Sequence, residues 1–417
     1  MNEVKKPELL IPASSLEVLK TAVNYGADAV YIGGETFSLR AKARNFSKED
    51  MALGIKYAHD HGVHVHVTAN ILAHNYDLKG AEEYFHELKE LGPDALIIAD
   101  PGMFMMARRI CPEIDIHVST QANNTNYETY KFWHELGAKR VVAARELSLA
   151  EIKEIRANIP DDLEIEAFIH GAMCISYSGR CLLSNYFTGR DANHGACTHP
   201  CRWKYAVVEE SRPGEYLPVY ENERGTFIFN SKDLCMIEHI PELIDAGINS
   251  FKIEGRMKTA LYVATVARTY RKAIDDYLES EDKYRSNMSW YQDEIARCTY
   301  RQFTTGFYFG KPSDESQIYD SNTYVNEYTY LGIVEGIDEN KRARLEQKNK
   351  FSVGEVVEIM KTDGRDIETT VKAIYAQDGT MQESAPHPKQ LIDVEFDITP
   401  KEGDVIRIHA PQNGNLR

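Results

Sequence analysis

The stretch VHVHVTANILAHNYDLKGAEEYFHELKELGPDALIIAD, residues 63–100, contains one complete strand–helix–strand unit. Its two ends, 63–68 and 95–99, are short and rich in aliphatic residues, as strands buried in a parallel sheet are. Between them, 78–91 has the apolar spacing of an amphipathic helix. Gly92 follows that helix, where a glycine lets the chain turn back toward the next strand. The stretch therefore predicts one β-α-β unit of a parallel sheet.

The same alternation of short apolar runs and amphipathic patterns covers most of residues 1–280. The expected strands are 8–12, 28–33, 63–68, 95–99, 114–118, 140–144, 164–169 and 250–254. The expected helices are about 15–25, 47–60, 78–91, 101–110, 123–137, 148–158, 236–246 and 258–278. Eight such units predict an α/β fold, a TIM-like (β/α)8 barrel, with a doubly wound open sheet as the alternative.

A barrel also predicts where function lies, because functional residues of such barrels gather at the C-terminal ends of the strands. The side chains expected at those ends are mostly polar or glycine: Gly33, Gly34, Thr68, Asn70, Asp100, Ser119, Thr120, Gln121, Arg145, Glu146, His170, Glu254, Gly255 and Arg256. This composition is the one that a binding site requires.

The seventh unit departs from the regular pattern. Its strand ends near His170, yet the next helix begins only near 236, which leaves a long insertion over 171–235. A loop of that length needs something to organise it, and a metal centre is one such device. Downstream, 281–326 is predicted to be a linker, and 327–417 a small antiparallel β-barrel of about six strands.

The composition is that of a globular protein. Of the 417 residues, 43% are hydrophobic and 27% are charged, and the length favours two domains. The chain has no apolar run long enough for a membrane span and no signal-peptide core, so we expect a cytoplasmic protein without a membrane partner. The net charge of −16 argues against general coating of nucleic acid, although 171–205 and 250–272 are locally basic.

Four cysteines lie close together in the insertion. Cys174, Cys181, Cys197 and Cys201 have the spacing C-x6-C-x15-C-x3-C, and Cys235 follows 34 positions later. A disulfide framework is not expected in a reducing compartment. Three interpretations stay open: packing cysteines, a structural zinc site and an iron–sulfur cluster. Zinc prefers cysteine pairs two to four residues apart, which only one pair here satisfies, whereas a cluster accepts wider spacing.

Several blocks of the sequence resemble one protein family. EAFIHGAMCISYSGRCLLSNYF (166–187) resembles the signature of the U-thirty-two peptidase family, historically called collagenase-like. HVSTQANNTN (117–126), NSKDLC (230–235) and FKIEGRMK (251–258) resemble further blocks of the same family. The likeness runs from about residue 5 to 280, and the appended β domain suits some members. As an ensemble these motifs are specific.

Within that family, a barrel with one C-terminal β domain resembles a bacterial group that hydroxylates tRNA. The resemblance implies an enzyme that converts the wobble uridine of tRNA to 5-hydroxyuridine, with a 4Fe-4S cluster as cofactor and prephenate as co-substrate. It implies that Cys174, Cys181 and Cys197 are cluster ligands, with Cys201 as the fourth and Cys235 as its alternative. The expected partners are the tRNA anticodon loop and, in a homo- or hetero-oligomer, a paralogous subunit.

Two arginines are the expected contacts of the co-substrate. Prephenate is a dicarboxylate, and arginine binds carboxylates through a planar fork of donors. Arg145 and Arg256 end the sixth and eighth strands, so we expect them to clamp prephenate at the barrel mouth. Gln121 and His170 are expected close by as catalytic candidates.

Glu166 and His170 lie four residues apart on one strand, and they are candidates for an acid/base pair or for zinc ligands. The alternative is that Glu166 fills a layer of the barrel through a salt bridge while His170 alone lines the mouth. For the two arginines, the alternative is a pair of exposed salt bridges to Glu146 and Glu254.

The substrate contacts are expected to include basic and aromatic side chains. Lys252 and Tyr177 are candidates for direct contact with substrate. The basic segments 180–204 and 252–272 flank the mouth and suit the phosphates of an anticodon loop. The candidates for stacking on an extruded base are Tyr177, Tyr186 and Trp203.

Two other functions stay open. The historical family label raises a peptidase, but the sequence contains neither an HExxH zinc motif nor a GxSxG nucleophile motif. No residue set here therefore specifies proteolysis. A non-catalytic RNA-binding protein, with the β domain as its docking module, is the other alternative.

Overall fold

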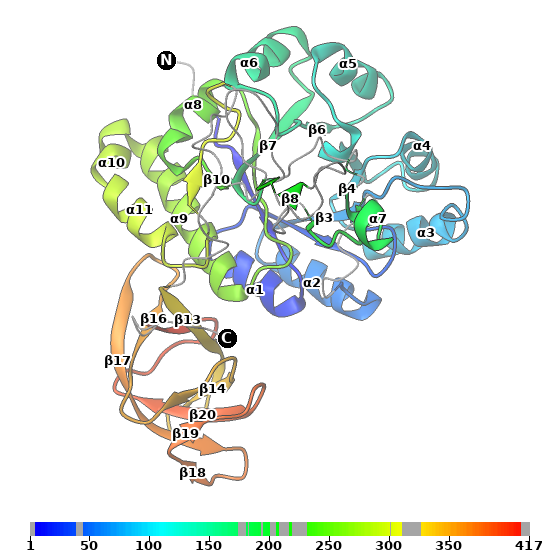
Figure 1. Cartoon of the computed structure of the whole chain (residues 1–417). Helices are drawn as coiled ribbons and strands as arrows, with labels where there is room; N and C mark the ends of the chain where they lie inside the picture. The colour runs from blue at the N-terminus through cyan, green and yellow to red at the C-terminus, as the bar shows by residue number, and fades with distance from the viewer. Residues whose placement is uncertain are drawn as a thin grey trace. The chain divides into compact units, whose positions relative to one another are not determined.

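The computed structural model describes residues 5–38, 45–173, 181, 183–192, 195–200, 206–207, 217–218, 232–300, 302–310 and 327–409 (Figure 1). The chain divides into two compact units. Unit 1 comprises Met1–Leu19, Asp28–Met257 and Arg301–Thr323, and unit 2 comprises Lys20–Ala27, Lys258–Tyr300 and Tyr324–Arg417.

Unit 1 contains a closed barrel of parallel strands. The barrel strands are β1 (Glu8–Pro12), β2 (Ala29–Gly33), β3 (His64–Ala69), β4 (Ala95–Ile98), β5 (Asp115–Val118), β6 (Arg140–Val142), β7 (Glu164–Gly171) and β11 (Ser250–Ile253). Each strand pairs in parallel with the next one, and β11 pairs with both β7 and β1, which closes the barrel. The predicted barrel is confirmed, with its eight strands at the predicted positions.

Helices follow the strands in the predicted order. They are α1 (Leu16–Asn24), α2 (Lys48–Asp60), α3 (Ala81–Leu91), α4 (Pro101–Ile110), α5 (Tyr127–Glu135), α6 (Leu149–Asn158), α8 (Ile240–Asp245) and α9 (Ala260–Glu279). Figure 1 shows α2 to α6 on the outside of the parallel strands. Their ends follow local chemistry: Ser148 and Glu151 form a capping box at α6. Gly92, at a φ of 66°, ends α3 and donates its N–H to Leu88.

The insertion after β7 extends the sheet beyond the barrel. It contains α7 (Leu183–Thr188), the antiparallel pair β8 (Ala206–Val207) and β9 (Leu217–Pro218), and β10 (Asp233–Cys235). β10 pairs antiparallel with the end of β7, so that Cys235 lies opposite His170. On its other side, β10 pairs with β12 (Phe303–Thr304). Cys235 is therefore held beside the C-terminal end of a barrel strand.

Unit 2 contains a second, antiparallel barrel. Its strands are β13 (Tyr328–Ile337), β14 (Ala343–Glu346), β15 (Phe351–Ser352), β16 (Val356–Met360), β17 (Asp366–Ala376), β18 (Met381–Gln382), β19 (Ser384–Ala385), β20 (Leu391–Phe396) and β21 (Val405–His409). Six of them pair in the order β16-β21-β13-β14-β20-β17, and β17 closes on β16. The predicted six-stranded β-barrel is thus confirmed.

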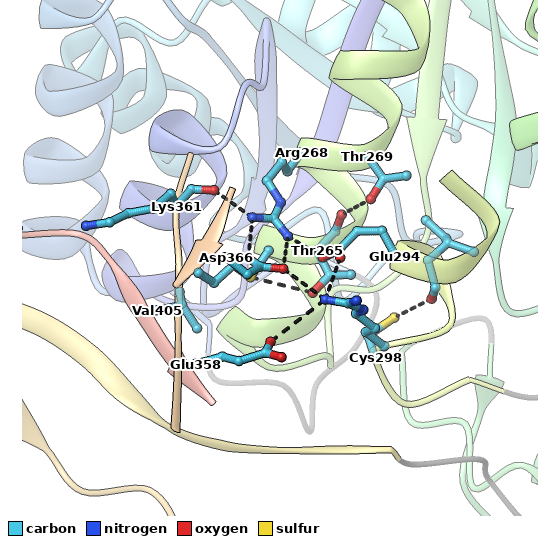
Figure 2. A network of polar contacts seen from close by, with 12 residues as sticks. Thr265, Arg268, Thr269, Glu294, Cys298, Glu358, Lys361, Asp366 and Val405 are labelled. Carbon is cyan, nitrogen blue, oxygen red and sulfur yellow. Dashed lines mark hydrogen bonds and ion pairs between the residues drawn. The ribbon is translucent and has the colours of Figure 1, made fainter. Parts of the chain in front are cut away.

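Unit 2 also contains α9 and two helices that follow it, α10 (Glu281–Ser286) and α11 (Met288–Ile295). The segment predicted as a linker, 281–326, therefore begins with helices. Buried ion pairs join them to the β-barrel: Arg268 of α9 contacts both Glu294 of α11 and Asp366 of β17 (Figure 2). Within the described residues, each helix is too short or too polar to span a lipid bilayer.

Candidate functional site

A polar hollow lies at the C-terminal ends of the barrel strands. Its lining residues come from seven of the eight strands or the loops after them: Tyr31, Thr68, Asn70, Ile97, Ser119, Thr120, Gln121, Arg145, Phe168, Lys252, Glu254 and Arg256. The empty space of this hollow, with its solvent-open part included, is about 470 Å³. The predicted residues Gln121, Arg145, Lys252 and Arg256 meet here.

Arg145 is held in the hollow by three neighbours. Its Nη2 lies 3.1 Å from Glu254 Oε2, and its Nη1 donates to the carbonyl of Ala172 at 3.1 Å. The guanidinium carbon lies 4.0 Å from the centre of the Phe168 ring, a cation–π contact. The salt bridge to Glu254, considered above as an exposed surface pair, is formed, but the side chain of Arg145 is only 8% exposed.

Arg256 lies in the same hollow and is also buried. Its Nη1 donates to the hydroxyls of Ser38 and Thr68, each at 2.7 Å. A Cβ on Gly33 would lie 2.8 Å from that Nη1 and closer still to Ser38 Oγ, so a larger residue at position 33 would displace the hydroxyl or the guanidinium. The hydroxyls of Ser38 and Thr68, together with the nearby β2 backbone, thus fix the orientation of the Arg256 guanidinium.

Lys252 forms the floor of the hollow. Its Nζ lies 2.6 Å from Glu166 Oε1, and it sits over the rings of Tyr31 and Phe168 at 4.5 and 5.5 Å. Glu166 is fully buried, and its other oxygen accepts from Arg140 at 3.1 Å. Burial raises the pKa of Glu166, but Lys252 and Arg140 outweigh burial and lower the pKa below its ordinary value. Glu166 is therefore an ionised carboxylate that holds Lys252 in place.

His170 lies outside this set. It is buried, its ring packs 5.7 Å from that of Phe303, and it is not among the residues that line the hollow. Glu166 forms ion pairs with Arg140 and Lys252, as in the interpretation that it fills a layer of the barrel. The pairing of β7 with β11 shifts register between Lys252 and Ile253, which breaks the simple alternation along β7. The two residues considered as an acid/base pair thus have different partners.

Sequence reasoning missed three buried polar residues beneath the hollow. His66 of β3 and His117 of β5 have their rings 4.7 Å apart, and Arg140 of β6 forms ion pairs with Glu8, Glu164 and Glu166. One ring nitrogen of His66, one ring nitrogen of His117 and one carboxylate oxygen of Glu166 all lie within 4.8 Å of one another. The available signal was a histidine at an inward position of two apolar strands, in VHVHVT and IDIHV.

Three of the five candidate cysteine ligands can be located. Cys174 and Cys201 lie outside the described residues, whereas Cys181, Cys197 and Cys235 are partly exposed and form no disulfide with another described cysteine. Ser184, at the start of α7, accepts a hydrogen bond from the backbone N–H of Thr198 at 3.0 Å. This bond holds the segment after Cys181 against the segment of Cys197. The backbone N–H of His199 points to Cys197 Sγ at 3.4 Å.

The aromatic candidates differ in how far they can be placed. Tyr177 and Trp203 lie outside the described residues. Tyr186 is 81% exposed on α7, and its ring meets that of Phe187 edge-on at 5.1 Å.

Among the cysteines outside the insertion, Cys111 is buried. Burial raises the pKa of its thiol to about 11, which suits a packing role.

The closed barrel, the cysteine-bearing insertion at its functional end and the separate six-stranded β-barrel define a two-part α/β barrel protein. Residues 14–318 match the model of Peptidase family U32, and residues 326–407 match that of the Peptidase family U32 C-terminal domain. The chain therefore belongs to peptidase family U32.

Two relatives named for tRNA hydroxylation are similar over most of the chain, and a third relative is similar over a shorter part. The tRNA hydroxylation protein P1 of Bacillus subtilis is 41% identical, covering 94% of this chain and 92% of the relative. The tRNA hydroxylation protein P of Escherichia coli is also 41% identical, covering 86% of this chain and 87% of the relative. The 23S rRNA 5-hydroxycytidine C2501 synthase of Escherichia coli is 39% identical, covering 65% of this chain and 40% of the relative.

Proposed function

We propose that this protein is an RNA-modifying enzyme that hydroxylates the wobble uridine of tRNA to 5-hydroxyuridine. The observation that carries the proposal is the end-to-end similarity to proteins named for tRNA hydroxylation, which includes both the barrel and the β domain. A relative named for hydroxylation of a ribosomal cytidine supports the same chemistry on a second RNA.

The hollow supports prephenate as co-substrate. Among the described residues that line it, three are cationic, Arg145, Lys252 and Arg256, and Glu254 is the one carboxylate. We propose that Arg256 binds one carboxylate of prephenate through its fork, and that the second carboxylate replaces Glu254 as the partner of Arg145. Gln121 faces the same space and supplies an amide donor and acceptor for the remaining polar groups of the ligand.

The cysteines support an iron–sulfur centre. Cys181 and Cys197 are accessible thiols on two segments that Ser184 and Thr198 hold together, and a backbone N–H points at one sulfur. Such N–H contacts are among the features that tune cluster potentials. These residues fit a 4Fe-4S cluster, whose ligands we propose to be Cys174, Cys181, Cys197 and Cys201, with Cys235 as the alternative fourth. A bound cluster supplies one-electron chemistry.

The remaining contribution of the chain is to bind and orient a base. A uridine in an anticodon loop reaches an enclosed site only when it leaves its stack. Tyr186 presents an exposed aromatic face on the same insertion that carries Cys181, so we propose that it stacks on a nucleotide of the loop. We expect a soluble, cytoplasmic location and an oligomer with a paralogous subunit as further parts of this proposal.

Peptidase chemistry has less support from the described residues. The carboxylate of Glu166 is taken up by two cations, and His170 is buried against an aromatic ring. Neither is arranged as a base beside an exposed nucleophile.

The decisive experiment is mass analysis of tRNA nucleosides from a deletion strain. We expect 5-hydroxyuridine to disappear and to return when the wild-type gene is supplied. Unchanged 5-hydroxyuridine would overturn the proposal and favour a non-catalytic RNA-binding role. In parallel, anaerobically purified protein should be brown and should bleach with dithionite, while colourless, zinc-loaded protein would exclude the cluster. Peptides released from gelatin by a Cys174→Ala, Cys181→Ala variant would support a peptidase instead.

A further inference from the structure

A polar layer crosses the inside of the barrel beneath the hollow. In a barrel of this kind, four inward side chains from alternate strands form one layer. Here the layer is formed by side chains of β1, β3, β5 and β7, namely Glu8, His66, His117 and Glu166. Two positions further along β3, β5 and its loop, and β7, the residues Thr68, Ser119 and Phe168 line the hollow. The layer thus lies directly below the proposed substrate site.

Each of the two histidines of this layer has one ring nitrogen without a hydrogen bond. His66 and His117 are 2% and 3% exposed, and among the described residues the Nδ1 atom of each has no hydrogen-bond partner. Buried polar atoms without a partner are rare and call for a bound water, ion or ligand. Burial lowers the pKa of His66 to about 4 and that of His117 below its ordinary value. Both imidazoles are therefore neutral near pH 7, which is the form that binds metals.

Glu166 completes a set of three ligand side chains. Its carboxylate lies with the two histidine nitrogens inside a 4.8 Å span. Arg140 and Lys252 hydrogen-bond its two oxygens, as outer groups commonly do for a metal-binding carboxylate.

The charges around Glu166 leave room for a cation. The ion-pair cluster contains three carboxylates, Glu8, Glu164 and Glu166, and two cations, Arg140 and Lys252, so negative charge exceeds positive by one. Glu164 and Glu8 are partly exposed, at 22% and 16%, so the excess lies beside the buried Glu166 rather than within a desolvated layer, and it favours binding of a positive ion.

We propose that His66, His117 and Glu166 bind a divalent transition-metal ion, with zinc as the reference ion, inside the barrel. Two imidazoles and one carboxylate are an established ligand set for zinc, with a fourth position left for water. The site uses none of the cysteines and does not depend on the proposed function. It also changes the partner of Glu166: the sequence suggested His170 as the second ligand, whereas the fold brings His66 and His117 to it from other strands.

The test uses the full-length protein and zinc itself. Wild type, His66→Gln, His117→Gln and the control His64→Gln are stripped with a chelator and dialysed against Zn²⁺, and bound zinc is measured by elemental mass spectrometry. His64 lies on β3 as well but is exposed, so its replacement leaves the layer intact. Zinc held by cysteines contributes equally to all four proteins. We expect wild type and His64→Gln to hold about one zinc ion per chain more than the other two.

Two further measurements keep the result clear. Zinc should raise the midpoint of thermal unfolding of wild type and His64→Gln, but not of the two layer variants, because only a folded site binds it. Loading the wild type with cobalt in place of zinc identifies the ligands even if the variants do not fold. Cobalt bound by thiolates has a sulfur-to-metal charge-transfer band, whereas cobalt bound by nitrogen and oxygen lacks it. Equal zinc in all four folded proteins, or a cobalt spectrum from thiolates alone, would overturn the proposal.

Discussion

Arg407 on the last strand, β21, and Glu294 on α11 form an ion pair in which both side chains are almost completely buried, at 0% and 1% exposure. Arg407 also contacts Glu358 at 2.9 Å and Asp366 at 2.8 Å. Arg268 of α9 shares Glu294 and Asp366 with it (Figure 2). The helices α9 and α11 and the β-barrel thus share one buried network.

We therefore predict that Arg407→Met destabilises unit 2 strongly. Removing one partner leaves buried carboxylates without full compensation, and such changes typically cost about 3–5 kcal/mol. Denaturant unfolding of the full chain measures the loss. Arg365→Met is the control, because Arg365 forms an exposed pair with Asp363, and we expect little change there. Similar unfolding of both variants would show that the network adds nothing to stability.

Glu8 predicts how stability responds to acid. Burial raises its pKa, but His66, which is charged only in acid, and Arg140 outweigh burial and lower the pKa from 4.5 to about 2. The folded state therefore favours the ionised carboxylate. Its contribution is fully present above about pH 4.5 and is lost as the pH falls toward 2.

Chemical unfolding between pH 6 and 2 checks this slope. Glu8→Gln should be less stable than wild type near neutral pH and should lose less stability on acidification. Glu82→Gln, at an exposed position of α3, is the control and should follow wild type. Parallel pH profiles for wild type and Glu8→Gln would contradict the prediction.

Arg256→Lys should weaken the proposed reaction while leaving the fold intact. Lysine keeps the positive charge but lacks the planar fork of donors. Loss of one charge-assisted hydrogen bond costs about 1.5–3 kcal/mol, which corresponds to roughly a 10- to 100-fold decrease in prephenate-dependent turnover. Arg109→Lys, on the exposed side of α4, is the matched control. Gly33→Ala tests the same site sterically, since its methyl group would push against the guanidinium. Wild-type turnover in both Arg256→Lys and Gly33→Ala would show that Arg256 does not bind the co-substrate.

Ser184→Ala should loosen the cysteine insertion. The variant removes the acceptor of the Thr198 N–H and the contacts of the same hydroxyl with Thr198 Oγ1 and the carbonyl of Ala196, which join the segments that carry Cys181 and Cys197. We expect iron per chain, measured after anaerobic purification, to fall by about half or more, since a lost buried bond costs about 1 kcal/mol or more. Ser286→Ala, which removes an exposed hydroxyl from the end of α10, should keep the wild-type iron content.

Local sequence signals predicted much of the fold. The apolar runs and glycine turns gave the eight barrel strands and their order, and the cysteine motif with its flanking blocks gave the family. The same reasoning placed Gln121, Arg145 and Arg256 at one edge of the barrel, because parallel strands end at one edge, and these three residues line the hollow. These features depend on periodicity along a single segment.

Contacts between distant strands were decided only by the tertiary structure. The closed barrel and its strand stagger bring His66, His117 and Glu166 together from β3, β5 and β7, and they place Glu254 against Arg145. In unit 2, the network around Arg407 joins α9, which was predicted as a helix of the α/β barrel, and α11, which lies in the predicted linker, to the strands of the β-barrel. The physical reason is that a strand's own pattern shows which side chains face inward, whereas which of them touch depends on how far each strand is shifted against its neighbours.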